Sequence, residues 1–116
     1  MKVSEIIEIL EAELLVGTGT DMEIHAACGA DLMSDVMAYV KDNVLLLTGL
    51  VSPQVIRTAE MMDIKAVVFV RGKNPGPAVL ELAEEKGMIV LTTRNPMFIA
   101  CGKLYGAGLI GKGVRE

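Results

Sequence analysis

The chain has 116 residues, of which 52% are hydrophobic and 22% charged, and its net charge is −4. This length fits one compact domain and is too short for two. Eleven Lys and Arg, two Phe, two Tyr and no Trp are too few basic and aromatic side chains to follow a phosphate backbone or to stack on bases. We therefore expect one domain over residues 1–116 that does not bind nucleic acid.

The sequence predicts neither a secretory signal nor a membrane-spanning helix. Acidic residues, rather than an apolar run, follow Met1 and Lys2, and the longest stretch without a charge has 14 residues and contains Pro53. A spanning helix needs about 20 apolar residues. We expect a cytoplasmic protein without membrane contact, whose cysteines stay reduced.

The first part of the chain predicts a helix, two short strands and a second helix. Ser4 is the candidate N-cap of the first helix, which has apolar residues at helical spacing. Short strands are expected over 14–16 and 22–27. The second helix is expected to begin at Asp31 and to end at 42–43.

The second part of the chain predicts a β-α unit repeated three times. Continuous apolar runs at 44–47, 66–70 and 88–91 are typical of strands covered on both faces. Each run is followed by a polar turn and a helix with proline near its first position. The expected helices are Pro53–Met62, Pro77–Lys86 and Pro96–Tyr105. This order predicts an α/β fold in which a largely parallel central sheet lies between two helix layers.

The loops after these three strands form the candidate ligand site, because ligands of open α/β sheets bind outside the carboxyl ends of parallel strands. The loops are 48–52, 71–74 and 92–95, and they supply hydroxyl groups, positive charge and glycines. Residues 1–42 carry a net charge of −7 and residues 43–116 one of +3, which also favours the second part for an anionic ligand such as phosphate or a nucleotide. The candidate site residues are Thr48, Gly49, Ser52, Arg71, Gly72, Lys73, Thr92, Thr93 and Arg94.

The same residues have a purely structural interpretation. Ser52 and Asn95 are suitable helix caps, the glycines are suitable turn residues, and exposed cations on loops are usually solvated. The sequence alone leaves both interpretations open.

No catalytic arrangement is visible in the sequence. His25 is the only histidine and lies in an alternating segment, and Asp31 and Asp35 are explained as a cap and a solvated acid. The glycines of 106–111 match a dinucleotide-binding pattern, but they follow an expected helix rather than a strand. We expect no catalytic residue there, and a helix end followed by a loose or edge-pairing tail.

The two cysteines, Cys28 and Cys101, are 73 positions apart, and no CxxC motif is present. Together with His25 they are too few to make a four-ligand zinc or iron–sulfur site within one chain. We expect reduced, buried thiols and no metal or other cofactor. A site shared between two chains is the alternative.

Four segments carry a family resemblance: 28–37, 47–59, 67–72 and 95–100. Together they resemble the DRTGG domain family over nearly the whole chain. The resemblance implies a three-layer α/β domain with no known catalytic centre. Relatives occur as modules in phosphotransacetylases and between CBS domains in some pyrophosphatases, and the N-terminal domain of HPr kinase has a similar fold.

The family's motif is matched in part. Gly49 and Gly72 correspond to its conserved turns. Leu50 and Val51 stand where the family commonly has Asp-Arg, and 70–72 read Val-Arg-Gly where it has Thr-Gly-Gly. We expect Arg71 to restore the guanidinium of the missing Arg to the same group of loops, from the neighbouring loop.

These observations favour a non-catalytic regulatory or ligand-sensing module. A mean hydropathy of +0.47 in so short a chain also favours a homodimer. The alternative is a structural interaction protein that docks on a redox enzyme through its acidic first part or through Met33 and Met37. Similar stand-alone proteins are sometimes described as iron–sulfur-binding hydrogenase proteins, which makes a cluster between two subunits, using Cys28 and Cys101, a third hypothesis.

Overall fold

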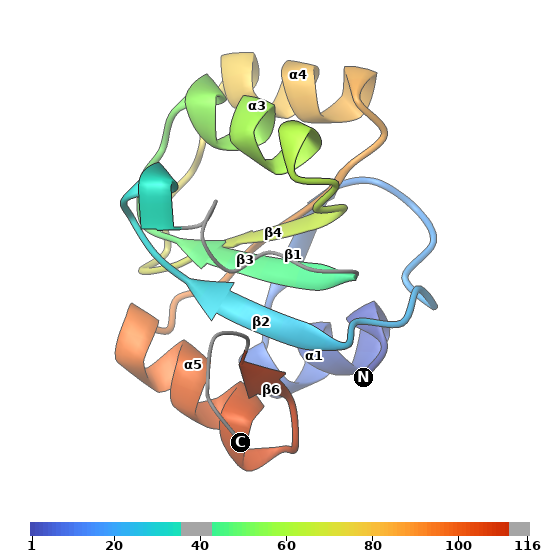
Figure 1. The fold of residues 1–116 in the computed structure, drawn as a ribbon, viewed down its shortest axis with the longest axis vertical. Coiled ribbons are helices and arrows are strands. Elements are labelled where there is room, and N and C mark those ends of the chain that lie inside the picture. The colour runs from blue at the N-terminus through green and yellow to red at the C-terminus, as the bar shows by residue number, and fades with distance from the viewer. Residues whose placement is uncertain (36–42, 112–116) are drawn as a thin grey trace.

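The structure, a computed structural model, describes residues 1–35 and 43–111. It forms three layers, with a six-stranded sheet between two pairs of helices (Figure 1). The elements are α1 (Val3–Leu10), β1 (Glu13–Val16), β2 (Ala26–Gly29), β3 (Val44–Thr48), α3 (Pro53–Met61), β4 (Ala66–Phe69), α4 (Pro77–Glu85), β5 (Ile89–Thr92), α5 (Met97–Gly106) and β6 (Ile110–Gly111).

The strand order is β1-β5-β4-β3-β2-β6. The neighbours from β5 to β6 all pair in parallel, and only β1, at one edge, pairs antiparallel, with β5. The predicted α/β fold with a largely parallel sheet is therefore confirmed. Of the two tails expected after the last helix, loose or edge-pairing, residues 110–111 show the edge-pairing one, because β6 follows the end of α5 and pairs with β2.

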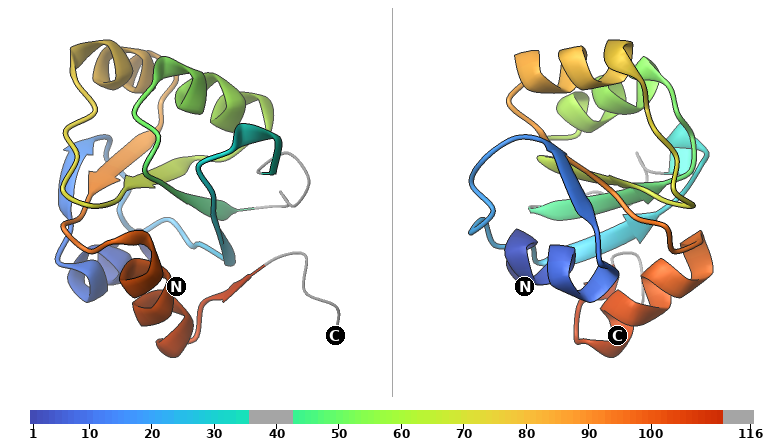
Figure 2. Two further views of the ribbon diagram at one scale, coloured as in Figure 1. Left: turned by 90° about the vertical axis from the view of Figure 1, so that its left-hand side faces the viewer. Right: turned by 180° about the vertical axis from the view of Figure 1, so that it is seen from behind.

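Both faces of the central strands are buried, and this explains their continuous apolar sequences. All residues of β3 and β4 are buried. α3 and α4 cover one face, where Phe69 and Ile56 belong to the core, and α1 and α5 cover the other, where Ile6 and Leu47 do (Figure 2). No helix in the described residues is long and apolar enough to cross a membrane.

The expected N-cap at Ser4 is wrong, because α1 begins at Val3 with Lys2 as the N-cap. The first amides of the helix find partners in the segment between β1 and β2: Val3 N donates to Met22 O at 3.1 Å and Ser4 N to Thr20 O at 2.7 Å. A side-chain cap is unnecessary when a distant carbonyl satisfies the same donors.

The strand expected at 22–27 is displaced to Ala26–Gly29. The residues before it pair with the start of α1 instead, through a bridge between Lys2 and Glu23 and a 2.7 Å hydrogen bond from Ile24 N to Met1 O. The alternation of apolar and polar residues identified extended backbone here but not its hydrogen-bonding partner.

The other expected helix boundaries differ from the observed ones by one or two residues. Two expected capping residues, Asp31 and Asn95, do not cap their helices. Asp31 lies in a bend, the helical residues begin at position 33, and 36–42 of this expected helix lie outside the described residues. Asn95 does not cap α5, whose N-cap is Pro96. Asp31 instead accepts a hydrogen bond from Gly49 N in the loop after β3, and Asn95 donates one to Leu10 O at the end of α1.

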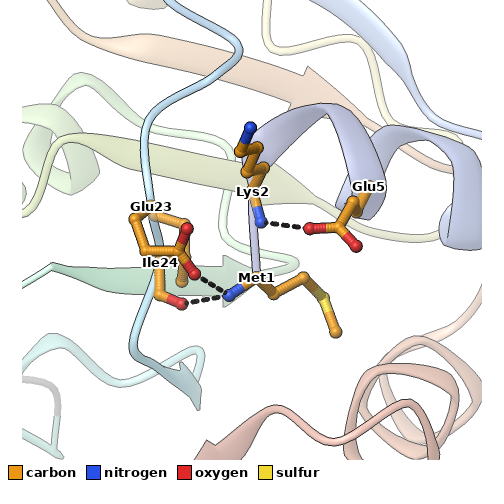
Figure 3. Close-up of polar contacts among 5 residues, drawn as sticks. All are labelled: Met1, Lys2, Glu5, Glu23 and Ile24. Carbon is orange, nitrogen blue, oxygen red and sulfur yellow. Dashed lines mark hydrogen bonds and ion pairs between the residues drawn. The ribbon is translucent and has the colours of Figure 1, made fainter.

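The chain start is tied to the segment before β2 (Figure 3). The N-terminal ammonium of Met1 donates to the Glu23 carboxylate and, at 3.0 Å, to Ile24 O. This hydrogen bond and the positive charge of the ammonium lower the pKa of Glu23 below its ordinary value of 4.5. Because the pair is exposed, its contribution is small and sensitive to salt.

We predict that Glu23→Gln lowers the thermal midpoint of the protein near neutral pH. A lowered folded pKa stabilises the fold above the ordinary value, and that stabilisation is lost as pH falls through the folded pKa. The difference between variant and wild type should therefore shrink as the pH is lowered below 4.5 and vanish once Glu23 is protonated in the folded protein, which thermal denaturation at a series of pH values measures. A difference that persists unchanged in acid would contradict the ion pair as its cause.

Candidate functional site

The carboxyl ends of β3, β4 and β5 lie side by side, so the three predicted loops meet at one edge of the sheet. The loop after β4 leads to α4 on one face, whereas the loop after β5 leads to α5 on the other (Figures 1 and 2). The chain therefore diverges between these two strands. Such a divergence opens a crevice, which is where open α/β sheets bind ligands.

A cavity of about 750 Å³ lies at this divergence. Five of the nine predicted site residues line it, all from the loops after β4 and β5: Gly72, Lys73, Thr92, Thr93 and Arg94. The size is within the range of about 300–1,000 Å³ that is usual for small-molecule sites.

Hydrogen bonds fix the two loops against each other. Arg71 N donates to Asn95 O at 3.0 Å, and Gly72 N donates to Thr93 O at 2.7 Å. The Thr92 hydroxyl donates to Lys73 O at 2.9 Å. The threonine hydroxyls expected to face a ligand thus shape the loops.

The loop after β5 is also tied to the end of α1. The buried Thr93 hydroxyl donates to Leu10 O at 2.8 Å, and Asn95 Nδ2 donates to the same carbonyl at 2.9 Å. Residues in the last turn of a helix have carbonyls without a partner inside the helix. Leu10 O finds its partners in the loop that carries Arg94.

The remaining predicted residues lie outside the cavity, around the end of β3. Thr48 is fully buried, and its hydroxyl accepts a hydrogen bond from Leu50 N. Ser52 caps α3 by accepting from Gln54 N at 3.1 Å, as the structural interpretation of the sequence anticipated. Both side chains have clear structural roles.

Arg71 and Gly49 approach each other closely. A Cβ atom on Gly49 would lie 3.1 Å from Arg71 Nη2 and 3.3 Å from Asp31 Oδ1. Gly49 N donates to the same Asp31 oxygen at 2.7 Å, and Lys73 Nζ donates to Gly49 O at 2.9 Å. A larger residue at this position would require the guanidinium and the carboxylate to shift by a few tenths of an ångström.

Arg71 has a left-handed backbone, with φ of 65°, and Gly72 follows with φ of 66°. An L-residue in this conformation carries a cost of about 1–2 kcal/mol. Strained residues that the surrounding structure holds in place are concentrated at ligand sites and switches. Glu11, Asn43 and Asp63 adopt the same backbone conformation, so this strain is shared with other turns and is not specific to the candidate site.

Sequence reasoning missed the acidic residues at this edge. Glu11 and Glu13 line the cavity opposite the basic loops, and Asp31 holds the turn at Gly49. The charge segregation along the chain gave no sign of this, because β1 pairs with β5 across a separation of about 80 residues. The site is of mixed charge.

Cys28 lies on β2 and Cys101 on α5, and neither lines the cavity. Burial raises the pKa of both, and the neighbouring Cys101 and Asp35 raise that of Cys28 further. Cys101 Sγ lies 3.7 Å from Met97 Sδ. Within residues 1–35 and 43–111, no three His, Cys, Asp or Glu side chains are grouped so that they could hold a metal ion.

We predict that Arg71→Gly stabilises the fold by about 1 kcal/mol, because glycine adopts the left-handed conformation without a steric cost. Arg71→Ala keeps the strain and serves as the matched control. Urea denaturation measures both. Equal midpoints for the two variants would show that the backbone of residue 71 is not strained.

We predict slow alkylation of Cys28 and Cys101 by iodoacetamide near pH 8, because the thiolate is the reactive form and a raised pKa depletes it. The rate should increase several-fold when the protein is unfolded in urea at the same pH. Single Cys→Ser variants would assign the two rates. Alkylation of the folded protein at the rate of a free thiol would contradict the raised pKa.

Comparison with known proteins identifies the fold and the family. The crystal structure of the CBS and DRTGG domains of the regulatory region of Clostridium perfringens pyrophosphatase, complexed with the activator diadenosine tetraphosphate, matches with a TM-score of 0.70. The match covers 89% of this chain and 45% of that one at 15% identity, so it shows a shared fold, and this chain spans less than half of the longer one.

Among curated proteins, no sequence matches this chain. The family model of the DRTGG domain matches residues 5–103, which include β1 to β5 and most of α5. The resemblance found in the sequence is thereby confirmed. The chain belongs to the DRTGG domain family.

Proposed function

We propose that this chain is a non-catalytic regulatory module that senses a small anionic ligand. The observation that carries the proposal is the cavity at the divergence of the loops after β4 and β5, where Lys73 and Arg94 supply positive charge. Membership of the DRTGG family supports a regulatory role, since the structural relative from Clostridium perfringens is part of a regulatory region.

The mixed charge of the cavity favours a nucleotide over inorganic phosphate. Lys73 and Arg94 suit a phosphate group, whereas Glu11 and Glu13 would repel a compact anion that filled the cavity. A ligand with hydroxyl or amino groups beyond its phosphate can donate hydrogen bonds to these carboxylates. The apolar side chains of Leu15 and Leu80 complete a lining suited to a ring.

Arg71 is the residue that would respond to such a ligand. Its guanidinium lies beside Gly49, outside the cavity lining, and its backbone N–H donates to Asn95 O in the loop after β5. Within the described residues, neither Arg71 nor Arg94 takes part in an ion pair. We also propose that residues 1–116 form a single domain, that the protein is cytoplasmic and that it is a homodimer.

Thermal shifts against adenine nucleotides, inorganic phosphate and small carboxylates test this function. A ligand at 100 times its dissociation constant adds about 2.7 kcal/mol of apparent stability. We predict that a nucleotide shifts the thermal midpoint of the wild type. Arg94→Ala should weaken nucleotide binding at least tenfold, because one cation of the cavity is lost. Arg57→Ala, on the exposed surface of α3, is the control and should bind as the wild type does.

Glu13→Gln separates the two ligand classes. It removes a charge that repels phosphate, so it should strengthen phosphate binding and weaken or leave unchanged the binding of a nucleotide. A panel without any shift would overturn the sensing function. It would favour docking on a redox enzyme. In that case the variant with both Arg71→Ala and Arg94→Ala should still capture the partner enzyme.

A further inference from the structure

Helix α5 exposes aromatic side chains that a monomer would be expected to bury. Phe98 is 84% exposed and Tyr105 74% exposed, while Phe69 is fully buried in the core. The chain has only two Phe, two Tyr and no Trp, and Tyr39 lies outside the described residues. Two of its four aromatic residues are therefore on the surface of one helix.

These residues form a stripe with a large–small–large pattern. Phe98 and Tyr105 are seven positions apart, so they lie on one side of α5, separated by two turns. Cys101 and Gly102 lie between them on the same side. A Cβ atom on Gly102 would have no atom within 4 Å, so the middle of the stripe is open to a close neighbour.

An apolar groove of about 330 Å³ adjoins this stripe, between α5 and the strands β2 and β6. No charged side chain lines it, and every lining residue is apolar, aromatic, cysteine or glycine. Ile110 on β6 is 57% exposed beside it and Ile99 on α5 is 43% exposed. The groove and the stripe make one continuous apolar surface, which we call the α5 surface.

We infer that the α5 surface is the interface with a second copy of this chain, in which the two α5 helices pack antiparallel across a twofold axis. This rests on the proposed homodimer and assigns its interface. A twofold interface requires that the same patch be complementary to itself. The stripe meets this requirement, because reversing it places Phe98 opposite Tyr105 of the second copy and brings the small residues together at the axis.

The two aromatic side chains supply part of the area that a stable dimer buries. A Phe or Tyr side chain buries about 150–250 Å², so Phe98 and Tyr105 offer roughly 300 Å² per protomer. A standard interface buries about 800 Å² per partner. Ile110 and the groove supply further apolar surface, while Lys103 lies away from the stripe and would remain at the solvated rim.

Gly102→Glu tests the interface. In the monomer the new side chain enters open space and replaces a glycine inside a helix, so the fold should be retained. In the dimer it places two negative charges near the axis. We expect sedimentation equilibrium of the wild type to give a dimer at about 100 μM, and Gly102→Glu to raise the dimer dissociation constant at least tenfold.

Lys103→Glu is the matched control, since it introduces the same side chain at the next position but away from the stripe, and it should change the dissociation constant less than threefold. Tyr105→Ser supplies a second disrupting variant, with circular dichroism to verify the fold of each protein. A wild type that stays monomeric overturns the homodimer and this interface together. A dimer that Gly102→Glu and Tyr105→Ser leave intact overturns the interface alone, and the homodimer then uses another face.

Discussion

Burial of both faces of β3, β4 and β5 is the constraint on which the rest of this structure depends. Strands without an exposed face must have helices on both sides, and short β-α connections supply those helices only if the strands run parallel. Parallel strands bring all their carboxyl ends to one edge. The candidate ligand site, the strained turn at Arg71 and the cavity beside it all lie at that edge because of this arrangement.

The predictability of each element follows from whether its signal is local. The three apolar strands and the prolines at the helix starts are encoded within a few residues, so the β-α units were predicted within one or two positions. The start of α1 and the position of β2 were misplaced because carbonyls of Thr20 and Met22 satisfy amides that a local side chain was expected to cap. Contacts between distant segments leave no mark on the local pattern.

The site was predictable to a similar extent. The positions of the loops and of their basic residues could be predicted from the order of strands and helices. Which loops share the cavity could not: only the loops after β4 and β5 line it, while Thr48 and Ser52 support turns. The acidic contribution of Glu11 and Glu13 depends on the antiparallel pairing of β1 with β5. That pairing brings an acidic and a basic part of the chain together. The net charges of the two parts, calculated separately along the sequence, do not show that they are neighbours.

The paired hydrogen bonds to Leu10 O make the loop after β5 a mechanical link. Thr93 and Asn95 hold the carboxyl end of α1, and the same loop continues directly into α5, which packs against α1. A displacement of Arg94 by a bound molecule would therefore either break two hydrogen bonds to one carbonyl or carry both helices with it. The helix that bears Phe98 and Tyr105 thus follows directly in the chain on the loop that lines the cavity.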